Sequence, residues 1–159
     1  MFAGYQYTQE KLMRDQRLDK LASVLVGYSA GVKPGDLCRI TGESVGLPLL
    51  EAIYEQVLKA GGHPFVSMLS DAMEEAFYRV SGEAQLQYVS PISTFVVETI
   101  DVSIGIWADE NTKSMSNVDP KKQAAAAQAR KPISRRFLER AAQGQLRWVG
   151  TQFPTQASA

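Results

Sequence analysis

Four short runs of β-prone residues alternate with helical patterns along this sequence, and that alternation restricts the chain to few folds. The runs cover residues 37–41, 65–69, 102–107 and 146–150. Two successive strands joined through a helix must lie parallel, because the helix returns the chain to the edge where the first strand began. We therefore predict an α/β fold, a three-layer Rossmann-like open parallel sheet of about four strands with helices on both faces.

The helical segments are marked by apolar periodicity and by caps. Leucines at three- and four-residue steps predict one helix from Thr8 to Ala30. Capping side chains precede three later segments: Asp71, Ser90 before Pro91, and Asp119 before Pro120. We expect Lys131-Pro132 to divide the last of these into two helices, because proline has no N–H to continue the ladder.

Size and composition point to one domain, at residues 1–159, that needs no disulfide or structural metal. The single cysteine, Cys38, cannot form an internal bridge, which indicates a reducing compartment, and no secretory leader opens the chain. We expect a cytoplasmic protein without a membrane span. One histidine, His63, is too few for the usual ligand set of a catalytic zinc site.

Zero net charge conceals an uneven distribution. Residues 36–119 carry four basic and thirteen acidic side chains, whereas residues 121–147 carry eight basic and one acidic. The two segments can neutralise each other. The basic residues of the second segment follow helical spacing without interleaved aromatics, so we predict a solvated or internally paired face and no nucleic-acid partner.

Ligands of open parallel sheets lie at the carboxyl ends of the strands, so the residues that follow each run are the candidate site. The turn at residues 42–46 has neither the third glycine of a dinucleotide fingerprint nor the Lys-Ser/Thr of a phosphate loop. Carboxylates at this edge can hold a cation or an amine, but they also serve as helix caps and solvated loop residues. The cavity-facing candidates are Glu43, Ser44, Asp109 and Glu110.

Other conspicuous residues have simpler structural interpretations. His63 is expected at the opposite edge of the sheet, and Cys38 as a buried, inert thiol. Glu74 and Glu75 are adjacent on a helix and cannot face each other as an acid/base pair. Trp107 and Trp148 fall within predicted strands, where we expect them to pack in the core. The residues themselves thus predict a fold without identifying a reaction.

The order of several short segments resembles a known family. The segments are Leu18 to Ala22 with Val32 to Asp36, Glu51 to Lys59 with Ala60 to Pro64, Asp101 to Trp107, Val118 to Pro120, and Arg147 to Thr155. Together they resemble the N-terminal domain of the M29 thermophilic-type metallo-aminopeptidases. The resemblance extends from about Leu18 to Ala159, and its specificity lies in the order and spacing of segments that are individually turn-like.

The resemblance implies a two-domain, dimeric enzyme that releases N-terminal amino acids from short peptides. In that family a larger C-terminal domain supplies the ligands of two divalent ions, zinc or cobalt, and a catalytic tyrosine. Those positions correspond to none in this sequence, so we assign no catalytic or metal residue here and expect this chain to bind neither ion. The N-terminal domain walls the active-site cavity.

We therefore hypothesise that the chain is this non-catalytic domain, inactive alone, with the C-terminal domain as its partner and the polypeptide expected to continue past Ala159. Two alternatives stay open. One is a domain of the related ring-opening dioxygenases that act on dihydroxypyridine. The other is a stand-alone module that binds a small ligand or a protein at the strand-end edge.

Overall fold

A four-stranded parallel sheet forms the centre of the computed structural model, which describes residues 15–108 and 118–154. The strands are β1 (Leu37–Glu43), β2 (His63–Leu69), β3 (Val102–Trp107) and β4 (Arg147–Gln152). Their order is β2-β1-β3-β4, with β1 and β3 in the centre. The predicted open parallel sheet is confirmed. Strand β1 ends two residues later than predicted, β2 begins two residues earlier, and β4 begins one residue later and ends two residues later.

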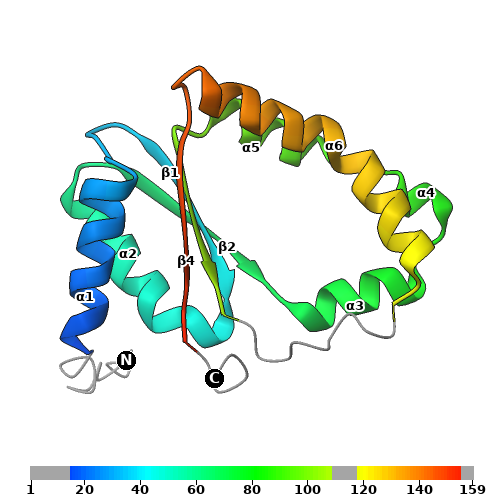
Figure 1. Ribbon diagram of the computed structural model, residues 1–159, viewed down its shortest axis with the longest axis horizontal. Coiled ribbons are helices and arrows are strands. Elements are labelled where there is room, and N and C mark those ends of the chain that lie inside the picture. Colours follow the sequence, from blue (N-terminus) through cyan, green and yellow to red (C-terminus); the bar gives the residue numbers. More distant parts are fainter. Residues whose placement is uncertain (1–14, 109–117, 155–159) are drawn as a thin grey trace, which may run out of the picture.

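One face of the sheet holds the main apolar core. Helices α1 (Gln16–Ser23) and α2 (Leu47–Lys59) cover it together with a π-helical turn, η2 (Val24–Ser29) (Figure 1). The fully buried side chains of this layer are mainly β-branched or leucine: Ile40, Leu49, Leu50, Ile53, Val57, Val102, Ile104 and Ile106. This layer contributes most of the hydrophobic stabilisation, because apolar area removed from water is the dominant favourable term in folding.

Hydrogen bonds at the amino-terminal edge fix the starts of all four strands. The Asp36 carboxylate accepts the Lys33 N–H and the Arg147 guanidinium, both at 2.6 Å, and Arg147 also donates to the Gly31 carbonyl. The Asp36 carbonyl accepts the His63 N–H at 2.8 Å. Asp101 repeats the device, since its carboxylate accepts the Leu37 N–H and its carbonyl the Arg147 N–H. Two aspartates therefore connect β1 to β2, β3 and β4.

The remaining helices lie on the other side of the sheet (Figure 1). They are α3 (Asp71–Val80), α4 (Glu83–Leu86), α5 (Pro91–Thr99) and α6 (Pro120–Ala142). Helices α3 and α4 and the amino-terminal part of α6 extend away from the sheet. A small separate core joins α3, α4 and the start of α6 through Tyr78, Leu86, Val118 and Ala126. In Figure 1, α6 lies beside α5 at its carboxyl end and beside α4 at its amino end.

The predicted division of the last helix at Pro132 is wrong. Helix α6 is continuous from Pro120 to Ala142 with Pro132 inside it. Proline costs a helix interior one hydrogen bond and a steric clash. Tertiary contacts offset that cost, because Arg136 and Arg140, one and two turns beyond the proline, both anchor α6 to α5.

Local predictions at the other helix ends are mostly confirmed. Ser90 and Asp119 accept backbone N–H groups of the helices that follow them, and Gly61, at a φ of 80°, follows the end of α2. The cap of α3 is Ser70 rather than Asp71, since the Ser70 hydroxyl accepts the Met73 N–H. The predicted start of the first helix, at Thr8, lies outside the described residues. Within them the helix begins at Gln16, and its second half is the π-helical turn η2.

The first prediction concerns the Arg147–Asp36 contact. Arg147→Met should lower the free energy of unfolding by about 2 kcal/mol, because a charge-assisted hydrogen bond is lost and the half-buried Asp36 carboxylate keeps fewer partners. Urea denaturation followed by circular dichroism measures this. The matched control is Arg79→Met, which removes an exposed pair with Glu75 at 3.4 Å and should cost under about 0.5 kcal/mol. Equal effects of the two changes would contradict the role given to Arg147.

The second prediction concerns Cys38, which is buried as expected. Burial, and then the negative charge of Asp36, raise the pKa of Cys38 from 9.0 to about 11. The unfolded chain loses this proton first, so the thiol's contribution to stability is complete below pH 9.0 and is lost as the pH rises toward 11. Between about pH 8 and about pH 10, wild type should therefore lose about 1 kcal/mol of unfolding free energy relative to Cys38→Ala. Parallel denaturation curves for the two proteins would reject the raised pKa.

No helix within residues 15–108 and 118–154 is both long enough and apolar enough to cross a membrane.

Candidate functional site

The two faces of the sheet differ in chemistry. In a parallel sheet, residues paired in register point to the same face. Arg39 pairs with Phe65 on β2 and Ser103 on β3, and Ser103 pairs with Trp148 on β4. These side chains point away from the main core. The face toward α5 and α6 therefore carries an arginine, hydroxyls and tryptophans where a fully covered sheet would carry aliphatic residues.

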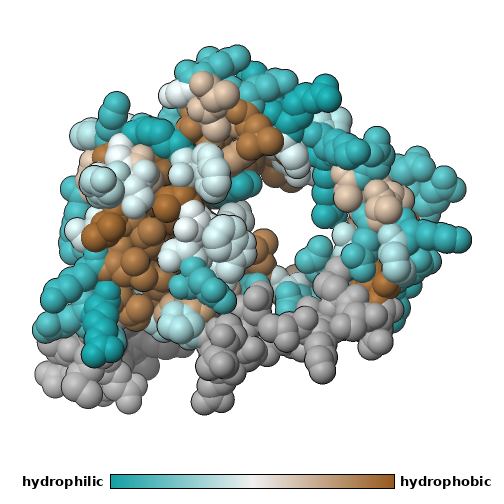
Figure 2. Space-filling model, in the orientation of Figure 1, coloured by the Kyte–Doolittle hydropathy of each residue, from teal (hydrophilic) through white to brown (hydrophobic). Residues whose placement is uncertain are grey.

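A cavity of about 590 Å³ lies between this face and the α5–α6 pair. Figure 2 shows an opening between the sheet and the outer helices. The sheet contributes Arg39 and Ser67 to the cavity, and the helices contribute its other lining residues: Ile92, Ser93, Val96, Val97, Ile133, Ser134, Phe137 and Leu138. The helices supply mainly aliphatic and aromatic groups, so the cavity has one charged floor residue beneath an apolar roof.

Arg39 is the single charged lining residue in the part of the chain that the structure describes, and its environment is unusual. Its Nη2 donates to the Ser103 hydroxyl at 3.2 Å, while its Nε is buried without a hydrogen-bond partner. Burial lowers the pKa of Arg39 from its ordinary value. Guanidinium groups stay charged in proteins, so this burial carries an unrepaid desolvation cost. Among the described residues no carboxylate pairs with Arg39.

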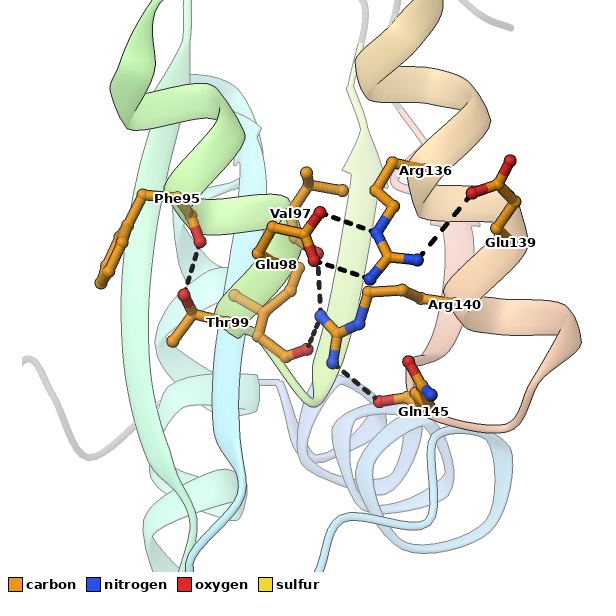
Figure 3. Close-up of polar contacts among 9 residues, drawn as sticks. Phe95, Val97, Glu98, Thr99, Arg136, Glu139, Arg140 and Gln145 are labelled. Carbon is orange, nitrogen blue, oxygen red and sulfur yellow. Dashed lines mark hydrogen bonds and ion pairs between the residues drawn. The ribbon is translucent and has the colours of Figure 1, made fainter.

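A second arginine of this region differs from Arg39 because it has several hydrogen-bond partners. Arg140, which is 8% exposed, donates to the carbonyls of Val97, Ile100 and Gln145 (Figure 3). One turn earlier, Arg136 forms a two-pronged pair with Glu98 at 2.7 and 2.8 Å. These contacts hold α6 against α5 and so fix the roof of the cavity. Arg136 and Arg140 are thus paired within the chain, whereas the prediction for this basic segment was a solvated or internally paired face.

The tryptophans were predicted to pack in the core, and that prediction is wrong. Trp107 and Trp148 are 55% and 54% exposed. Their strands alternate faces, and both indoles lie on the face that the helices leave partly open. Trp148 contacts Phe137 of α6 at a ring separation of 6.4 Å, and Trp107 lies over Gly150 of β4.

Two of the four predicted site residues, Glu43 and Ser44, lie within the described residues. Glu43 ends β1, and Ser44 begins a short 3₁₀ turn, η3 (Ser44–Gly46), so both lie at the carboxyl edge as predicted but neither lines the cavity. Asp109 and Glu110 lie outside the described residues. His63 is exposed at the amino-terminal end of β2, at the opposite edge, as expected.

Sequence reasoning missed Arg39. The available signal was an arginine between Cys38 and Ile40, inside a run that otherwise predicts a central buried strand. An unpaired charge in such a position is costly and is found mainly where a site requires it.

The described residues do not form a metal centre. Within residues 15–108 and 118–154, no three His, Cys, Asp or Glu side chains come together in a group that could hold an ion. The described residues therefore do not fit a two-metal site.

Fold and cavity together define a Rossmann-like α/β domain with one open, polar sheet face. The chain belongs to the M29 family of thermophilic metalloproteases, whose sequence profile matches residues 14–159. Nothing among the curated proteins matches the chain.

A solved structure has the same fold. Wild-type AmpT from Thermus thermophilus matches with a TM-score of 0.74 at 14% identity, over 90% of this chain and 37% of AmpT. The chain thus spans little more than a third of that protein. The CurK enoyl reductase matches 92% of this chain and 55% of its own at 12% identity, with a TM-score of 0.37 that is too low to indicate a common fold.

A prediction follows from the packing of Trp107 on Gly150. A Cβ at position 150 would lie 2.2 Å from the indole, so Gly150→Ala must displace the Trp107 ring from the sheet. In a Trp148→Phe background, the Trp107 emission should shift to longer wavelength as the ring enters water. Gly27→Ala is the matched control, because a Cβ at Gly27 meets no atom within 4 Å. An unchanged spectrum would show that the indole does not rest on Gly150.

Proposed function

We propose that this chain is the N-terminal, non-catalytic domain of a metal-dependent aminopeptidase that releases N-terminal amino acids from short peptides. The observation that carries the proposal is the M29 profile match over residues 14–159. The span of only 37% of AmpT is in keeping with a further domain in the same polypeptide. In this proposal that domain holds the two divalent ions, zinc or cobalt, and the complete enzyme is a cytoplasmic homodimer.

The role proposed for the domain is to wall the active-site cavity. Support comes from the open sheet face, because its arginine, hydroxyls and tryptophans resemble the lining of a ligand cavity more than a surface awaiting another helix layer. The residues proposed to face the active-site cavity are still those at the carboxyl edge, namely Glu43, Ser44, Asp109 and Glu110. The wall would exclude large polypeptides by shape and take no part in the chemical step.

A stand-alone binding module is the second candidate, and the Arg39 cavity favours it. A ligand site built wholly from this chain would function without another domain. No feature of the described residues favours the dioxygenase alternative over the peptidase.

Peptidase assays separate the two candidates. The 159-residue chain with added cobalt or zinc should release no p-nitroaniline from leucine p-nitroanilide, because its described residues gather no ligand group. The polypeptide encoded by the complete gene should do so, and a chelator should abolish the activity. Metal-dependent turnover by the 159-residue chain would refute the non-catalytic assignment. A reading frame that stops at Ala159 would favour the binding module.

A further inference from the structure

We propose that the cavity between the sheet and helices α5 and α6 binds a carboxylic acid with an apolar tail, and that Arg39 pairs with its carboxylate. The site lies wholly within this chain, so the proposal does not depend on the peptidase assignment. A free aliphatic acid and the C-terminus of a short apolar peptide share this chemistry.

Three arginines of the domain differ in the number of their hydrogen-bond partners. Arg140 has three carbonyl partners, and Arg147 has the Asp36 carboxylate and the Gly31 carbonyl. Arg39 has only the Ser103 hydroxyl among the described residues, although a guanidinium carries five N–H donors. Its position on the central strand prevents it from reaching bulk water as freely as a surface arginine. An anion in the cavity would supply the acceptor that the protein itself does not.

The lining selects the kind of anion. Among the described residues Arg39 is the only cationic one that lines the cavity, and a single planar guanidinium matches the two oxygens of a carboxylate through parallel hydrogen bonds. Phosphate groups carry more charge and are usually met by several donors or cations. The basic residues Lys131, Arg135 and Arg136 line a different depression, between α5 and α6.

The roof selects the tail. Ile92, Val96, Ile133 and Phe137 present aliphatic and aromatic surface above Arg39. Apolar groups placed there leave water, which contributes roughly 0.8 kcal/mol for each buried CH₂ by transfer data. Ser67, Ser93 and Ser134 add hydroxyls to the lining, and these can accept or donate additional hydrogen bonds. A ligand with one charged end and a chain of several carbons satisfies both halves of the cavity.

Isothermal titration calorimetry of the 159-residue chain tests the proposal with defined probes. Hexanoate should bind, and affinity should rise through acetate, butanoate and hexanoate. Hexanamide, which has the same tail without the charge, should bind at least about tenfold more weakly. Equal binding of hexanoate and hexanamide, or no binding of hexanoate at millimolar concentration, would overturn the proposal.

Variants locate the charge. Arg39→Met should weaken hexanoate binding by at least about tenfold, and Arg39→Lys should retain part of it. Thermal unfolding of both variants shows whether the fold persists. It should persist in Arg39→Met, because that change removes a buried donor without a partner. Arg79→Met, on the exposed surface of α3, is the control and should bind as wild type. Unchanged binding by folded Arg39→Met would contradict the assignment.

A final comparison identifies the source of the carboxylate. The tripeptide Ala-Leu-Leu and its C-terminal amide differ only in the group that would meet Arg39. Tighter binding of the peptide acid than of hexanoate, with loss on amidation, supports a peptide C-terminus. The reverse order supports a free acid. Equal binding of peptide acid and amide, together with a failure of hexanoate, would refute carboxylate recognition while leaving the proposed aminopeptidase role unaffected.

Discussion

The amino-terminal edge of the sheet is the constraint on which the rest of the structure depends. Asp36 and Asp101 each use both side-chain and backbone oxygens to hold the beginnings of neighbouring strands. Parallel strands lack tight hairpins to set their register, so distant segments must be aligned by other means. Here Arg147 joins the last strand to the turn before the first, 111 residues earlier in the chain. The register aligned there decides which side chains reach each face of the sheet.

A second set of contacts decides that the cavity exists at all. Helix α6 would be expected to end at Pro132, yet Arg136 and Arg140 attach its later turns to α5 through Glu98 and backbone carbonyls. Figure 3 shows these groups converging between the two helices. Helices α5 and α6 therefore contact each other more than they contact the sheet. The sheet face beneath them retains exposed polar and aromatic groups. The chain belongs to the M29 metalloprotease family, and no group of His, Cys, Asp or Glu among its described residues could hold a metal ion.

Features that depend on a few neighbouring residues could be predicted from the sequence. The strands, their parallel direction and the caps at Ser90 and Asp119 follow from local pattern and connection length. Features set by tertiary contacts could not. The sequence predicts Trp107 as a core residue because it lies in a strand. Position in a strand does not reveal whether other elements cover that face of the sheet, and Trp107 is exposed. The sequence places Arg39 inside a strand, but its position beneath α5 and α6 depends on tertiary contacts. Glu43 and Ser44 lie at the predicted edge and do not line the Arg39 cavity.

The division of apolar residues into two cores has a consequence for motion. The main core packs α1 and α2 on the sheet, whereas α3, α4 and the first turns of α6 share only the small cluster around Tyr78 and Leu86. Cooperative units with few buried apolar groups open at lower free energy than the units around a large core. Backbone amides of α3 and α4 should consequently exchange with deuterium well before those of β1 and β3. The sheet with α1 and α2 would thus be more rigid than the segment formed by α3, α4 and the first turns of α6.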